Sequence, residues 1–145
     1  MSIADTLLPE FDEEMKTTRR VLERVPDRPD WKPHPKSFSM AHLAQLLSWM
    51  PGWLTTMLKE TSLDLAAAGG YSNQKPADLL ASFDKQVKEA RAAIAASKDA
   101  DYSVMWSLKR GPMVLMSLPR MAVIRQTINH IVHHRGQMTV YLRLC

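Results

Sequence analysis

The stretch Pro119–Leu142, PRMAVIRQTINHIVHHRGQMTVYL, decides the fold of this chain. Its apolar residues recur at steps of three, four and seven, the spacing that gathers side chains on one face of an α-helix. They are Ile124, Ile128, Ile131, Met138 and Leu142. A helix with one apolar face must bury that face against other elements, and the rest of the sequence supplies them.

Three further segments carry the same helical periodicity: Asp5–Arg24, Phe38–Leu65 and Pro76–Ala96. The second is apolar over most of its girth, which predicts that it is the most buried helix. Pro51-Gly52 lies inside it and is expected to bend or break it. A proline-rich connector precedes it, and Ser37 or Ser39 is expected to cap its start. Pro76 suits the first turn of the third helix.

Residues 99–118 are the part with the weakest pattern. Tyr102, Val104, Trp106 and Leu108 alternate with other residues, and Gly111-Pro112 is a turn signal. This favours a small hairpin, with a packed loop as the alternative. Four long helices dominate either way, so the sequence predicts an all-α fold, an antiparallel four-helix bundle formed by residues 1–145 as a single domain.

Composition and charge limit the partners and the location that we expect for this protein. The chain has 145 residues and a net charge of +4, but its basic residues are scattered along the helices rather than gathered in a stripe, so we expect no nucleic-acid partner. No apolar run is long enough for a membrane span, and no leader pattern opens the chain. Cys145 is the only cysteine, which is typical of a reducing compartment. We therefore expect a cytoplasmic protein without a membrane partner.

The residues that could carry chemistry lie in the last helix. His130 and His134 are four apart, so their imidazoles lie on the same helix face and can reach one metal ion. Gln137 and Tyr141 continue that line, where either could donate a hydrogen bond, whereas His133 points about 60° away. There is no phosphate-binding loop, Cys-x-x-Cys pair or nucleophile elbow, which argues against a kinase or a conventional hydrolase.

The segment NHIVHHRGQMTVYLRL, Asn129–Leu144, resembles the closing motif of the DinB family (the DinB/YfiT-like metalloenzyme superfamily). FDEEMKTTRRVLERVP, WKPHPKS and LLSWMPGW are similar to the first helix, the connector and the second helix of one subfamily. The resemblance implies a DinB/YfiT-like antiparallel four-helix bundle with an unusual connection order, often a homodimer. The apolar girth of the second helix also favours a homodimer. The resemblance further implies a divalent metal (Zn, Ni or Fe) held by three histidines, and a low-molecular-weight thiol as co-substrate.

The same resemblance assigns metal-ligand positions. His130 and His134 match two of the three ligands, but Leu46 stands where the second helix carries the third. His42, one helical step of four earlier, and Glu14, an oxygen donor on the first helix, are the candidates to replace it. Two functions follow. One is a metal-dependent enzyme, a thiol-dependent S-transferase or isomerase acting on a small molecule. The other is a non-catalytic dimeric protein that binds a small molecule or serves in a stress response, with a degraded metal site.

Overall fold

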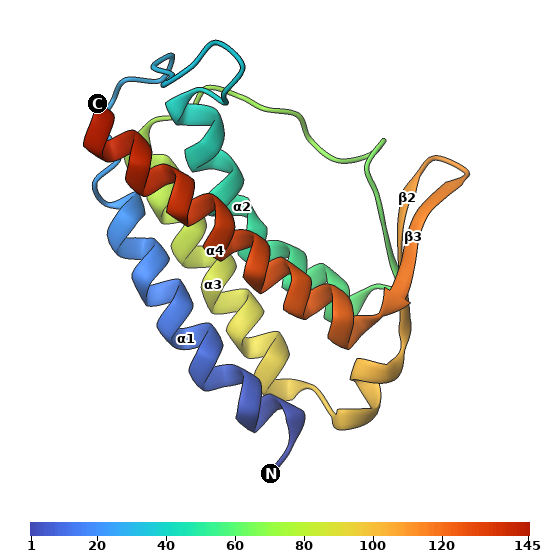
Figure 1. The fold of residues 1–145 in the computed structure, drawn as a ribbon. Coiled ribbons are helices and arrows are strands. Elements are labelled where there is room, and N and C mark those ends of the chain that lie inside the picture. Colours follow the sequence, from blue (N-terminus) through green and yellow to red (C-terminus); the bar gives the residue numbers. More distant parts are fainter.

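A computed structural model describes all residues, 1–145. Figure 1 shows four long helices packed side by side, with α1 and α4 running one way and α2 and α3 the other. Both α1 and α2 pack against α3 and α4. The helices are α1 (Ile3–Leu22), α2 (Met40–Lys59), α3 (Pro76–Ala96) and α4 (Arg120–Leu144), with a short 3₁₀ helix at Asp99–Ser103.

The helices begin where the sequence supplies capping groups. Ser2 and Asp5 form a reciprocal capping box at the start of α1, and the Ser39 hydroxyl accepts from the His42 backbone N–H at the start of α2. Pro76 stands in the first turn of α3. The predicted capping by Ser39 and the position of Pro76 are confirmed.

The helix α2 continues through Pro51 without a break. Gly52, the next residue, makes a close approach to α3, because a Cβ built there would lie 2.1 Å from Gln86 Oε1. The glycine therefore leaves room for the α3 side chain at this crossing. Pro51 itself is buried, which places the Pro-Gly step in the interface between α2 and its neighbours.

A three-stranded sheet makes the all-α prediction wrong. Its strands are β1 (Ser62–Asp64), β2 (Met105–Arg110) and β3 (Met113–Pro119), in the order β1-β2-β3. The fold is therefore α+β. The hairpin favoured for residues 99–118 is present as β2 and β3, which pair antiparallel. Its turn uses Gly111 with φ 58°, a left-handed conformation that suits glycine.

The range predicted for the second helix, Phe38–Leu65, extends too far at its C-terminal end, as the helix α2 shows. It ends at Lys59, and the next residues leave it to pair in parallel with β2, with Leu63 opposite Leu108. The apolar Leu63 and Leu65 continue the helical pattern by coincidence. Their actual partners lie more than forty residues further along the chain, so no local pattern could reveal the pairing.

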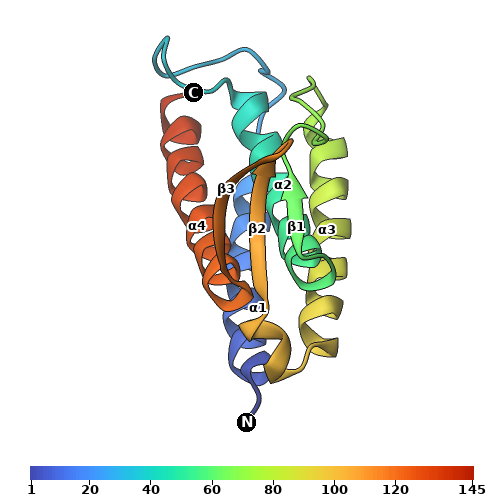
Figure 2. The ribbon, with the colours of Figure 1, turned by 90° about the vertical axis from the view of Figure 1, so that its right-hand side faces the viewer.

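The sheet lies over the helices and joins their core. In Figure 2 the three strands stand side by side in front of α2 and α4. Trp106 is only 1% exposed, and Leu63, Leu108, Met116 and Leu118 pack against the same core. The hairpin tip extends away from the helices in Figure 1. None of the helices has the length and apolar character needed to cross a membrane.

Candidate functional site

The two predicted histidines of α4 meet side by side. His130 Nε2 lies 2.8 Å from His134 Nε2, and the ring centroids are 4.5 Å apart. On the other side of the His134 ring, Nδ1 lies 2.7 Å from Gln137 Oε1. An amide oxygen only accepts, so His134 carries its proton on Nδ1, and its Nε2 lone pair faces His130. The prediction that these two imidazoles approach each other is confirmed.

The two rings differ in their exposure. His134 is buried at 8% exposed, whereas His130 is only partly covered and has part of its ring open to solvent. Partial burial holds the pKa of His130 below its ordinary value of 6.5, and the neighbouring His134 and His133 lower that pKa further. The His130 imidazole is therefore neutral at neutral pH, and its Nε2–H can donate to the His134 lone pair.

The other predicted ligands have different partners. His42 is held between two aromatic rings, with centroids 4.4 Å from Phe38 and 4.5 Å from Tyr71. Glu14 Oε2 lies 2.6 Å from Arg135 Nη1, an ion pair that links α1 to α4. Tyr141 donates its hydroxyl proton to the Phe38 carbonyl at 2.9 Å, which ties α4 to the connector before α2.

The residues present do not complete a three-ligand metal centre. No three His, Cys, Asp or Glu side chains in the chain lie close enough together to hold a metal ion. The structure brings His130 and His134 together, but it brings neither His42 nor Glu14 to them. Leu46 packs against the apolar core and offers no donor atom. A catalytic zinc ordinarily takes three protein ligands, and here only two nitrogens converge.

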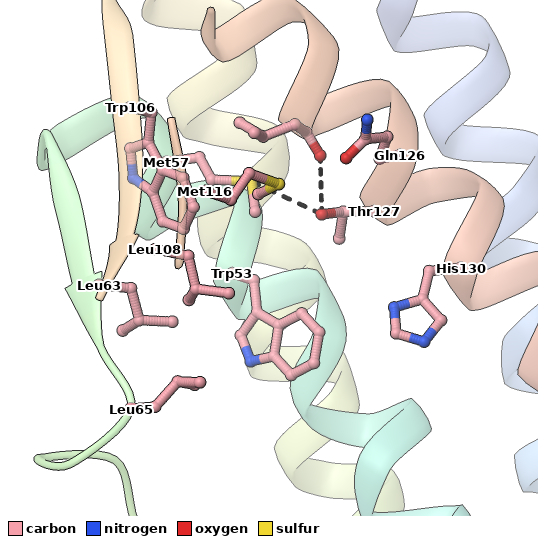
Figure 3. Close-up of a pocket in the computed structure, with 11 residues that line it drawn as sticks. Trp53, Met57, Leu63, Leu65, Trp106, Leu108, Met116, Gln126, Thr127 and His130 are labelled. Atoms are coloured by element: carbon pink, nitrogen blue, oxygen red, sulfur yellow. Dashed lines mark hydrogen bonds between the residues drawn. The ribbon is translucent and has the colours of Figure 1, made fainter. Parts of the chain in front are cut away.

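A pocket of about 460 Å³ opens next to His130, between α2, α4 and the sheet. In Figure 3, Trp53 lies between the leucines of the β1 side and His130. The Thr127 hydroxyl donates to the Val123 carbonyl at 2.9 Å, so it is already satisfied. The lining residues are mostly apolar: Trp53, Met57, Leu63, Leu65, Trp106, Leu108, Met116, Val123, Gln126, Thr127 and His130.

The sequence predicts a small-molecule binder as one of two functions, but it does not locate this pocket. A signal existed in the alternation of Trp106 and Leu108, since residues two apart share a face of a strand. That alternation indicates a strand face with large apolar side chains, but not which part of the fold the face covers. The pocket can hold an apolar molecule, and the His130 imidazole at its margin is one of the polar groups that could orient it, beside the Gln126 amide.

The comparisons with known proteins agree on one family. The DinB family profile matches residues 1–145. A DinB-like protein from Bacillus subtilis superimposes with a TM-score of 0.75 at 16% identity, covering 95% of this chain and 90% of its own. A DinB-like protein from Bacillus cereus superimposes with a TM-score of 0.74 at 19% identity, covering 99% and 92%. No match was found among curated proteins. The family resemblance of the sequence is thereby confirmed: this chain belongs to the DinB family.

Proposed function

We propose that the protein binds a small, mainly apolar molecule in the pocket between α2, α4 and the sheet, and that its family's metal site is reduced here to the His130–His134 pair. The observation that carries this proposal is the pocket itself, which is bordered by His130. Two tryptophans, Trp53 and Trp106, supply broad apolar faces. Aromatic walls with a few polar groups are typical of small-molecule sites.

The His130 imidazole gives the pocket a hydrogen-bonding group. Because its pKa is lowered by burial and by its histidine neighbours, it is neutral at neutral pH. A neutral ring can donate through one nitrogen and accept through the other. Since Nε2–H of His130 is directed at His134, the free nitrogen Nδ1 accepts. A ligand with an apolar body and one hydroxyl group would therefore satisfy both the walls and this imidazole.

The test is calorimetric titration with 1-naphthol, a flat apolar body that carries one hydroxyl. Met116→Trp should fill the pocket and weaken binding at least ten-fold. Val114→Trp is the matched control on the same strand, because Val114 is 54% exposed and does not line the pocket. Equal affinity in both variants, or no heat of binding in the unmodified protein, would contradict the proposal.

A metal-dependent S-transferase or isomerase is the second candidate, and the Gln137 contact is what favours it. A metal-bound histidine usually donates its other N–H to a neighbouring oxygen, and His134 makes that bond. The family supplies the broader expectation of a metalloenzyme superfamily. Here the chain would provide two nitrogen ligands, with a low-molecular-weight thiol as the second substrate.

Zinc binding separates the two candidates. We expect the metal-free protein to bind Zn²⁺ weakly, because two histidines are fewer ligands than a tight site needs. Leu46→His should raise the affinity markedly, and His130→Ala should abolish binding in either background. Elemental analysis of tag-free protein gives the native metal content. One tightly held metal per chain, unchanged by Leu46→His, would contradict the reduced metal site and favour the metalloenzyme.

A further inference from the structure

Three polar side chains of α4 form a hydrogen-bonded chain that ends in the wall of the pocket. Gln137 Oε1 lies 2.7 Å from His134 Nδ1, and His134 Nε2 lies 2.8 Å from His130 Nε2. His130 in turn lines the pocket. The three residues are spaced by three and four positions, so they lie on one face of the helix. Gln137 is exposed, and the chain therefore connects the protein surface to the pocket.

Each bond in this chain fixes the direction of the next. The Gln137 oxygen only accepts, so the proton of His134 lies on Nδ1 and its Nε2 carries a lone pair. Two lone pairs would repel each other at 2.8 Å, so His130 must present its own proton on Nε2. A neutral imidazole has a single N–H, which leaves Nδ1 of His130 as an acceptor.

Gln137 is the group that decides where the proton of His134 lies. The His134 ring is 8% exposed, so water has little access to its nitrogens. The neighbouring rings of His133 and Phe38 make aromatic contacts with it. The hydroxyl of Tyr141, one turn beyond Gln137, donates to the Phe38 carbonyl instead. The hydrogen-bond partners of His134 are therefore Gln137 and His130, and the His130 ring can adopt either proton position to match it.

The free nitrogen of His130 is turned toward the pocket. In Figure 3 a ring nitrogen of His130 lies on the side that faces Trp53. Because Nε2 is directed at His134, the nitrogen on this side is Nδ1. The Gln126 amide, another polar group of the wall, can both donate and accept, so it does not distinguish between ligands. His130 is therefore the group that can distinguish a ligand that donates a hydrogen bond from one that only accepts.

We propose that Gln137, which does not line the pocket, determines the class of ligand that the pocket selects. Acting through His134, it keeps Nδ1 of His130 an acceptor, so the pocket prefers apolar molecules that carry a hydroxyl group over ethers of similar shape. Gln137 is thus a positioning residue that sets specificity from outside the site. This inference rests on the proposed function, since it concerns the same pocket beside His130.

The first test compares 1-naphthol, which can donate, with 1-methoxynaphthalene, which only accepts. Calorimetry at neutral pH, on protein kept metal-free with a chelator, gives the ratio of the two affinities. We expect the unmodified protein to prefer 1-naphthol by about five-fold, the usual value of one net hydrogen bond. Gln137→Lys should remove or reverse this preference, because an ammonium group only donates and turns the chain around. The ratio is compared between variants, so the difference in size between the two ligands cancels.

Asn129→Lys is the matched control. Asn129 is an exposed residue of α4 next to His130, and it bonds to neither ring of the pair. The control adds the same positive charge near the pocket without changing the chain from Gln137. We therefore expect Asn129→Lys to keep the preference for 1-naphthol.

The second test observes the protons directly. Two-bond ¹H–¹⁵N NMR spectra of the histidine rings distinguish a protonated ring nitrogen from a bare one by its chemical shift. We expect His134 to carry its proton on Nδ1 in the unmodified protein and on Nε2 in Gln137→Lys. A residue that only maintained the fold would leave the position of this proton unchanged.

The outcomes separate this inference from the proposed function. A preference for 1-naphthol that Gln137→Lys leaves unchanged overturns the role of Gln137, and so does a preference that Asn129→Lys removes equally. A His134 proton on Nε2 in the unmodified protein, or one that stays on Nδ1 in Gln137→Lys, overturns the chain itself, whichever ligand binds. If neither naphthalene binds, the proposed function falls and the ligand preference falls with it, while the ring spectra still decide the order of the protons.

Discussion

His134 has both ring nitrogens engaged, and this determines what its neighbour can do. Nδ1 faces Gln137 and Nε2 faces His130, so the free hydrogen-bonding nitrogen of the pair is Nδ1 of His130. The buried imidazole thus has its polar groups satisfied without a metal, which avoids a cost of about 1–3 kcal/mol for an unpaired buried group. The exposed ring remains available to a ligand.

The lowered pKa of His130 makes stability depend on pH. In the unfolded chain His130 titrates near 6.5, whereas in the folded protein its pKa lies lower. Between those two values the unfolded state binds more protons, so stability rises with pH. The contribution of neutral His130 to the free energy of unfolding is fully present above pH 6.5 and is lost as pH falls through the folded pKa.

Urea unfolding of protein kept metal-free with a chelator checks this expectation. The free energy of unfolding should fall from pH 7 to pH 5 less steeply in His130→Gln than in the unmodified protein. An NMR titration of the His130 ring gives the folded pKa directly. A midpoint above 6.5 would contradict the assignment.

At the scale of elements, Asp64 ties the segment that follows β1 to the hairpin. Its Oδ1 accepts from the backbone N–H of Ala66 and of Gly111, both at 2.9 Å. These bonds, that of Gly111 first, lower the pKa of Asp64 below its usual 3.8. The bond to Gly111 joins the end of β1 to the turn between β2 and β3.

Asp64→Ala should therefore loosen the segment after β1 and the hairpin together. We expect a lower Tm, faster hydrogen exchange at Ala66 and Gly111, and weaker binding in the pocket. Asp64→Asn keeps one acceptor oxygen, so its Tm should fall less than that of Asp64→Ala. The stabilisation of the folded state by the ionised Asp64 carboxylate is present above pH 3.8 and disappears as pH falls through the lower folded pKa. Unchanged exchange at Gly111 in the alanine variant would contradict this role.

The elements differ in how far their sequence reveals them. The third helix has the predicted bounds, Pro76–Ala96, because proline starts it and its own periodicity defines its face. The strand β3 is obscured by a shift of register: Leu108 pairs with Met116 but Lys109 pairs with Val114, so Leu115 is an extra residue. That bulge turns an alternating pattern into the apolar run Val114-Leu115-Met116.

The site was predictable only in part, because most of its contacts join elements that are far apart in the sequence. The contact between His130 and His134 depends on spacing within one helix, which a sequence shows directly. The ion pair of Glu14 with Arg135 and the stacking of His42 on Tyr71 join separate elements. Those contacts depend on how α1, α4 and the segment after β1 are placed in space. The pocket depends on the parallel pairing of β1 with β2, which is also non-local.

At the scale of the whole molecule, most of the apolar surface of α2 is covered by other elements of the chain. It packs against α3 and α4 and is also in contact with β1. Leu46, Trp49 and Trp53 of α2 stay only partly buried, so the homodimer remains a prediction from this helix and from the family resemblance. Sedimentation velocity at micromolar concentration measures it, and a monomer alone would contradict it.

The sheet and the helices should unfold as one unit. Trp106 of β2 and Tyr102 of the 3₁₀ helix belong to the same buried cluster as Phe11, Leu47 and Ile128 of the helices. Because they share one core, loss of the sheet exposes helix surface as well. Trp106→Ala should cost about 3–5 kcal/mol, the usual range for a large buried aromatic residue. Val104→Ala, at an exposed position just before β2, is the control and should cost little.

The measurement compares two signals in one urea titration. Circular dichroism follows the helices, and hydrogen exchange at the β2 amides follows the sheet. Coincident transitions, shifted together by Trp106→Ala, are expected of a single cooperative domain. If the β2 amides exchanged at far lower urea than the helices unfold, the sheet would be an independent attachment, and the pocket beside His130 would open without unfolding of the helices.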